Sequence, residues 1–148
     1  MKSLRISCQL FLYHTRLEKE PESGDNKFAD VESGSWYEKS VSWACLNEIV
    51  NGISDTEFAP DTGISREQMA AILYRYAKYK QLDISKTQSG QYTDMESISD
   101  YAVDAVLWAL GKNIMVGSDG YFSPKNGATR AEAAAVFVRI SELFNEIK

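Results

Sequence analysis

Two stretches of the sequence share one pattern, and this pattern decides the fold. Residues 128–139 read Ala-Thr-Arg-Ala-Glu-Ala-Ala-Ala-Val-Phe-Val-Arg, and residues 64–75 read Ile-Ser-Arg-Glu-Gln-Met-Ala-Ala-Ile-Leu-Tyr-Arg. In each stretch a Ser or Thr is followed three residues later by Gln or Glu, which is the pattern of a capping box at a helix start. Apolar residues then recur every three or four positions, as on the buried face of an amphipathic helix. Both stretches are therefore predicted to be helices capped by Ser65 and Thr129.

The two helices belong to a longer internal repeat. Phe28-Ala-Asp-Val31 returns as Tyr92-Thr-Asp-Met95, and Phe58-Ala-Pro60 returns as Phe122-Ser-Pro124, at a shift of 64 to 65 residues. Several ordered matches at nearly one offset indicate two copies of a single structural unit. Each copy is predicted to be a helix, a loop too short for a real sheet, and a second helix.

The first helix of each copy has weaker boundary signals than the second. Ser35 precedes Trp-Tyr-Glu38, so Ser35 is predicted to be the N-cap of a capping box. Asp100 takes the place of Ser35 in the second copy. Asn51-Gly52, which tolerates left-handed geometry, is predicted to end the helix of the first copy.

A partial third copy opens the chain. Residues 4–14 align with residues 65–75 and share an Arg and a Leu-Tyr pair. The predicted organisation is a degenerate half repeat plus connector at 1–27, a repeat with connector at 28–91, and a repeat at 92–148. A two-helix unit cannot bury its apolar face alone, so the copies are expected to pack around a shared core.

Composition excludes several classes of function. The 148 residues carry a formal net charge of −5 and form no Lys/Arg cluster, so nucleic acid is not expected as a partner. His14 is the single histidine, and Cys8 and Cys45 are the two cysteines, too few for a structural zinc site. The loops 55–63 and 118–127 lack the alternating acidic ligands of a calcium loop. We therefore expect no metal, no cofactor and no Ser–His–Asp catalysis.

The chain contains no apolar run of about 20 residues, so membrane insertion is not expected. The first 13 residues have a basic head and a short apolar stretch, but Ser7 and Gln9 interrupt it and no small-residue cleavage site follows. This segment is interpreted as structure. If the protein is exported, we expect a true start further upstream or a chain that is a fragment.

The ordered motifs resemble those of the S-layer homology (SLH) domain. The characteristic tetrad of that family stands here as Thr129-Arg130-Ala131-Glu132, and as Ser65-Arg66-Glu67-Gln68 in the first copy. The similarity covers residues 28–80 and 92–145. It implies an all-α fold of tandem helix-loop-helix repeats around a pseudo-threefold axis, with the third repeat incomplete in this chain.

The resemblance also implies a noncatalytic function. SLH domains anchor surface proteins to a secondary cell-wall polysaccharide linked to peptidoglycan, often through a sugar carrying a pyruvate ketal, and the tetrad arginine is a recurrent contact. The expected location is extracellular, in the cell wall or S-layer. The expected carbohydrate-binding residues are the two tetrad arginines, their capping neighbours and nearby aromatics: Arg66, Arg130, Ser65, Thr129, Glu132, Trp43, Trp108 and Tyr121.

General physical chemistry is consistent with that role but leaves alternatives. An Arg at the first position of a helix lies beside free backbone N–H groups and the positive end of the dipole, and it can grip a carboxylate with two prongs. Arg66 and Arg130 could instead pair with a carboxylate of the adjacent repeat. The capping residues are expected to serve mainly as caps and only secondarily as ligand contacts. The tryptophans fall inside amphipathic helices, which favours the core over a sugar platform.

Two other functions remain open at the sequence level. An incomplete ring of repeats would expose an apolar face, which favours a protein-interaction scaffold completed by a partner or by a second copy in a homodimer. A glycosidase would need two grouped carboxylates, and the sequence groups none in a motif. A size-exclusion mass combined with cell-wall pelleting would separate an anchor from a scaffold.

Overall fold

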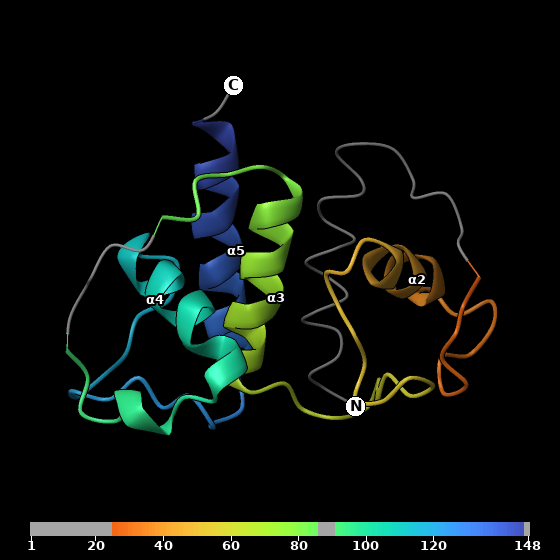
Figure 1. Ribbon diagram of the computed structural model, residues 1–148, viewed down its shortest axis with the longest axis horizontal. Helices are drawn as coiled ribbons and strands as arrows, with labels where there is room; N and C mark the ends of the chain where they lie inside the picture. The colour runs from red at the N-terminus through yellow and green to blue at the C-terminus, as the bar shows by residue number, and fades with distance from the viewer. Residues whose placement is uncertain (1–24, 86–90, 147–148) are drawn as a thin grey trace. The chain divides into compact units, whose positions relative to one another are not determined.

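The computed structural model describes residues 25–85 and 91–146, and within these ranges the protein is helical (Figure 1). Its elements are α2 (Glu38–Leu46), α3 (Arg66–Tyr79), the 3-10 turns η1 (Met95–Ser97) and η2 (Asp100–Ala102), α4 (Val103–Gly111) and α5 (Arg130–Asn145). The described ranges contain two isolated β-bridges and no strand. The predicted all-α class is confirmed. The half repeat predicted at the start of the chain lies largely outside the described residues, and the pseudo-threefold packing stays a prediction.

The chain divides into two compact units, residues 1–63 and 64–148. The division falls inside the first repeat, so α3 belongs to the same unit as the whole second repeat. The predicted domain boundaries at 27 and 91 therefore remain predictions about repeats rather than about compact units.

The first unit packs α2 against the segment that precedes it. Phe28, Val31 and Val41 are buried together, and the Phe28 and Phe58 ring centroids lie 5.3 Å apart. The Asp30 carboxylate accepts hydrogen bonds from the backbone N–H groups of Phe58 (2.8 Å) and Ala59 (2.6 Å). One aspartate thus fixes the loop that brings the second aromatic ring into this cluster.

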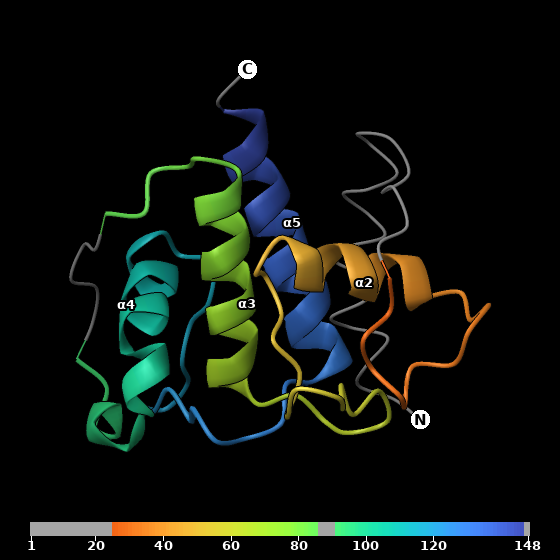
Figure 2. The ribbon, with the colours of Figure 1, turned by 45° about the vertical axis from the view of Figure 1, so that its right-hand side comes forward.

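The second unit has α3 packed against α4 and joined to α5 (Figure 2). Trp108 of α4 and Tyr76 of α3 are almost completely buried, and the Tyr76 ring meets that of Phe144 on α5 at 5.4 Å. Asp94 repeats the arrangement of the first unit, because its carboxylate accepts from the N–H groups of Phe122 (2.8 Å) and Ser123 (2.7 Å). The same motif therefore builds the same loop in both copies.

The helices α3 and α5 begin with the capping boxes that the sequence predicted. The Ser65 hydroxyl accepts from the Gln68 N–H (3.2 Å), and the Gln68 side chain accepts from the Ser65 N–H (2.8 Å). Thr129 and Glu132 exchange the same pair of hydrogen bonds at 3.1 and 2.7 Å. These reciprocal bonds satisfy N–H groups that a helix start leaves without partners.

The predicted boundaries of α2 are wrong at both ends. The helix begins at Glu38 after Tyr37, and the Ser35 hydroxyl is buried without a hydrogen-bond partner. Glu38 instead accepts a hydrogen bond from the Gly34 N–H at 2.7 Å. The helix ends at Leu46, well before the Asn51-Gly52 pair that was expected to end it.

The C-terminal ends of three helices explain why the end of α2 was predicted wrongly. Glu48, Gln81 and Asn113 each adopt a left-handed conformation, with φ between 54° and 57°. After α2, Glu48 N–H bonds to Cys45 O (3.1 Å) and Ile49 N–H bonds to Ala44 O (2.8 Å), which is a Schellman motif. The same pair of bonds follows α3 and α4. Non-glycine residues therefore end these helices.

Gly52 and Gly117 are needed for a different reason, because neighbouring atoms lie too close to the backbone at these positions to leave room for a side chain. A Cβ added at Gly117 would lie 2.4 Å from the ring of Tyr92 and 2.3 Å from the Tyr121 carbonyl oxygen. A Cβ at Gly52 would lie 2.5 Å from the ring of Phe28. Each repeat thus needs glycine where the backbone crosses the aromatic residue of its aspartate motif.

Candidate functional site

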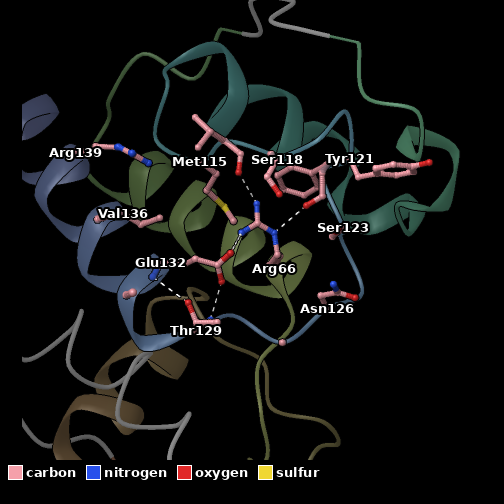
Figure 3. Close-up of a pocket in the computed structure, with 16 residues that line it drawn as sticks. Arg66, Met115, Ser118, Tyr121, Ser123, Asn126, Thr129, Glu132, Val136 and Arg139 are labelled. Atoms are coloured by element: carbon pink, nitrogen blue, oxygen red, sulfur yellow. Dashed lines mark hydrogen bonds and ion pairs between the residues drawn. The ribbon is translucent and has the colours of Figure 1, made fainter.

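A pocket of about 490 Å³ opens in the second unit, between α5 and the loop that joins α4 to it (Figure 3). One wall is the face of α5 that carries Thr129, Glu132, Val136 and Arg139, spaced at three, four and three residues. The opposite wall is the loop from Met115 to Ser123, continued by Asn126 and Gly127. Residues at this spacing share one helix face, so helical periodicity alone brings the α5 residues into the same pocket.

Arg66 of α3 lies between the two walls and holds them together (Figure 3). Its Nε donates to Phe122 O (2.9 Å) and its Nη2 donates to Val116 O (2.7 Å). Its Nη1 forms an ion pair with Glu132 at 2.5 Å, and the guanidinium lies 4.9 Å from the Phe122 ring centroid. Only 6% of Arg66 is exposed. Every nitrogen of this guanidinium therefore has a partner inside the protein.

These contacts correct part of the picture drawn from the sequence. Arg66 was expected to offer an open guanidinium to a ligand, but it pairs with Glu132 of the adjacent repeat, which is the alternative that the sequence had left open. The backbone N–H groups expected to be free at this helix start are also occupied. Arg66 N–H bonds to Asn126 O (2.9 Å) and Glu67 N–H bonds to Pro124 O (3.0 Å). The start of α3 is therefore closed to an anion.

Arg130, at the same position of α5, has a different environment. Its side chain is exposed, and it is not among the residues that line the pocket, although its neighbours Thr129 and Ala131 are. Ser65 also lies outside the lining, where its hydroxyl caps α3 and its backbone bridges to Gly127. The structure thus separates the two tetrads into an enclosed one and an exposed one.

The three predicted aromatic contacts are not equivalent. Tyr121 lines the pocket and is 51% exposed. Trp108 is fully buried in α4, and its indole N–H donates to Asp83 O (3.1 Å), so it cannot stack on a sugar. Trp43 is half-buried on α2 in the other unit and is absent from the pocket lining.

Sequence reasoning missed several polar groups that the pocket contains. Ser118, Ser123 and Asn126 line it from the loop side, and Arg139 lines it from α5. Arg139 was not among the expected carbohydrate-binding residues. Its position seven residues after Glu132, two turns along the same face, was the signal that could have placed it in the pocket.

A buried carboxylate fastens the start of α3 next to the pocket. Glu67 is 4% exposed and accepts hydrogen bonds from the Ser99 N–H (3.0 Å), the Ser99 hydroxyl (2.8 Å) and the Lys125 ammonium (2.7 Å). Burial alone would raise the pKa of Glu67, but the hydrogen bonds from Lys125 and Ser99 outweigh it, and the pKa lies below its usual value. Glu67 therefore acts as an ionised anchor between α3 and the segment around η2.

No group of three or more His, Cys, Asp or Glu side chains within residues 25–85 and 91–146 is placed to hold a metal ion. In the same part of the chain, no helix has the length and apolar character needed to cross a bilayer.

The geometry defines a helical repeat protein whose second compact unit carries an open pocket, lined by both polar and apolar groups. The family follows from comparison with known domains. The model of the S-layer homology domain matches residues 27–70 and 91–134, more than half of the chain, so the protein belongs to the SLH family. Domains of this family are noncatalytic modules that anchor proteins to the cell wall.

Relatives carry the same module within much longer proteins. The chain is 40% identical over 119 residues to an endoglucanase of Bacillus sp. (strain KSM-635), covering 79% of this chain and 12% of that protein. It is 36% identical over 126 residues to an amylopullulanase of Thermoanaerobacterium thermosulfurigenes, covering 82% and 7%. It is 29% identical over 146 residues to the surface-layer 125 kDa protein of Lysinibacillus sphaericus, covering 96% and 12%. The chain thus spans about a tenth of the length of these relatives.

Proposed function

We propose that this chain fixes a surface protein to the bacterial cell wall by binding a secondary wall polysaccharide that is linked to peptidoglycan and carries pyruvate ketals. The protein would act outside the cell and would perform no catalysis itself. Two of the relatives have enzyme names and one is a surface-layer protein, which suggests that such a module serves different cargoes.

The pocket of the second repeat is the observation that carries this proposal. Its lining combines hydroxyl and amide groups with arginine and with the ring of an exposed tyrosine. This set of groups suits a sugar that carries an acidic substituent. Hydroxyl and amide groups bond to sugar hydroxyls, and an aromatic face covers the apolar face of a pyranose. We propose Thr129, Glu132 and Tyr121 as contacts inside the pocket.

The remaining predicted residues take lesser parts in the proposal. Arg130, exposed on the first turn of α5, would act at the edge of the site, where its charge attracts an acidic polymer. Arg66 would support the pocket from inside through Glu132 and the loop carbonyls. Ser65 and Trp43 stay predictions with no place in this pocket.

Replacing the exposed tyrosine tests the proposal directly. Tyr121→Ala should weaken binding to purified walls by roughly 5- to 150-fold, as expected when a stacking ring worth about 1–3 kcal/mol is removed. Co-sedimentation with sacculi that retain the secondary polymer measures this effect. Tyr79→Ala is the matched control, because Tyr79 is also exposed (44%) but lies outside the pocket.

The same assay separates an anchor from a scaffold. Sacculi stripped of the secondary polymer should not pellet the unaltered protein, and a monomeric mass by size exclusion should accompany wall binding. A dimer that pellets with neither kind of sacculi would contradict the proposed function and support the scaffold alternative.

A further inference from the structure

We propose that Arg139 is the residue that recognises the carboxylate of the bound saccharide, and that Arg66 is only a positioning residue. The inference rests on the proposed function and goes further, because it assigns the acid specificity of the pocket to a side chain outside the tetrad.

The first argument is the balance of charge in the pocket. Three ionisable charged side chains line it, namely Arg66, Glu132 and Arg139. Arg66 and Glu132 form a 2.5 Å ion pair and neutralise each other. Arg139 is left as the uncompensated charge, so an acidic ligand in this pocket has one positive side chain to meet.

The second argument is the set of donors that each arginine has left. The three guanidinium nitrogens of Arg66 bond to Phe122 O, Val116 O and Glu132. Arg139 donates through Nη1 to Ile114 O at 3.2 Å, and within the described part of the chain its Nε and Nη2 have no partner. The single bond to Ile114 holds the guanidinium in place, while its remaining donors suit the two oxygens of a carboxylate.

The third argument is the separation between Arg139 and the carboxylate of Glu132. Seven residues of α-helix place them roughly 10 Å apart along the helix axis. Val136 lies between them on the same face, and Met115 faces it from the loop (Figure 3). A ligand acid at Arg139 would therefore avoid repulsion from Glu132.

This arrangement also suits the ketal group itself. A pyruvate ketal carries a carboxylate and a methyl group on one carbon. Arg139 offers donors for the carboxylate, while the pocket lining beside it is apolar at Val136 and Met115, whose side chains are almost completely buried. The sugar hydroxyls would then point toward Thr129 and the other end of the pocket.

A pair of small probes tests the assignment. One is a methyl hexopyranoside with a 4,6-O-(1-carboxyethylidene) group, and the other is the neutral 4,6-O-isopropylidene analogue, in which methyl replaces carboxylate. Titration calorimetry on the full chain should give a ten- to hundredfold preference for the acidic probe, the range expected for hydrogen bonds to a charged group.

Arg139→Gln should reduce this preference to about onefold while affinity for the neutral probe and the melting temperature stay nearly unchanged. Arg139→Lys should keep part of the preference, because a point charge remains but the planar fork is lost. Lys78→Gln, which removes an exposed positive charge outside the pocket, should keep all of it. If Arg139→Gln unfolds, the Arg139→Lys result decides.

Three results would overturn the assignment. If Arg139→Gln or Arg139→Lys prefers the acidic probe as strongly as the unaltered protein does, another group recognises the carboxylate. An unaltered protein that pellets with sacculi but binds both probes equally would remove this inference and leave wall anchoring intact. A protein that neither pellets nor binds either probe would remove the proposed function and this inference with it.

Discussion

The two tetrad arginines have the same place in the repeat but different surroundings. Arg66 is enclosed by two backbone carbonyls and the carboxylate of Glu132, whereas Arg130 is exposed. A sequence motif records the residue type and its position on the helix. It does not record which loop lies against that position, so the same Arg can be a structural tie in one copy and a surface group in the other.

Matched substitutions should expose this difference as stability. Arg66→Gln should lower the free energy of unfolding by roughly 2–4 kcal/mol, because it leaves Glu132 and two carbonyls without their cation. Arg130→Gln should change it by no more than about 0.5 kcal/mol, as for most exposed positions. Urea unfolding followed by circular dichroism measures both. Equal losses would mean that the contacts of Arg66 are not formed in solution.

At the scale of the elements, the sequence predicted the second helix of each repeat well and the first helix of the first repeat poorly. A capping box is a local signal, written in residues three apart, and both boxes were found where Ser65 and Thr129 predicted them. The end of α2 depends on Glu48 in a left-handed conformation, which is uncommon for that residue type. The end of α2 was predicted at Asn51-Gly52 because glycine often ends helices. Glycine is needed at position 52 for another reason, since the Phe28 ring lies against the backbone there.

The pocket was partly predictable for the same reason. Thr129 and Glu132 were predicted from the motif. Arg139 was not predicted, although helical periodicity would have placed it on the same face of α5. Tyr121 was found as an aromatic near the loop. The burial of Trp108 could not be read from spacing, because the partners that cover it, such as Tyr74 of α3, lie far away in the sequence.

The contact between α3 and the segment around η2 should make stability depend on pH. The pKa of Glu67 is lower in the folded protein than its usual value of 4.5, so its ionised form stabilises the fold above that value. This contribution is lost as the pH falls through the lowered pKa of the folded state. Glu67→Gln should therefore destabilise the protein by roughly 1–3 kcal/mol at pH 7 and by less near pH 3.

Melting curves of this variant at pH 7 and pH 3 provide the measurement. Glu142→Gln, on the exposed side of α5, is the control and should melt like the unaltered protein at both values. An equal loss of stability for Glu67→Gln at both pH values would show that its hydrogen bonds with Lys125 and Ser99 do not depend on ionisation.

At the scale of the whole molecule, one loop design is used twice. In both copies an aspartate binds two successive backbone N–H groups, and a glycine passes beneath the aromatic ring two residues before that aspartate. In the second copy, a pocket lies between this loop and the face of α5 that carries Glu132 and Arg139. The loop is therefore the constant part of the module, and the helix face beside it is where specificity can change.

Net charge sets the last expectation. The chain carries −5 and the proposed polymer is also acidic, so the two repel each other at long range although Arg139 attracts a carboxylate at short range. Salt screens interactions beyond about 10 Å at 0.1 M more than it screens a partly enclosed contact. Raising NaCl from 20 to 150 mM should therefore speed association with immobilised wall polymer and change the dissociation rate by less than about threefold. Surface plasmon resonance measures both rates, and a steep fall in association with salt would show instead that long-range attraction by surface cations drives the binding.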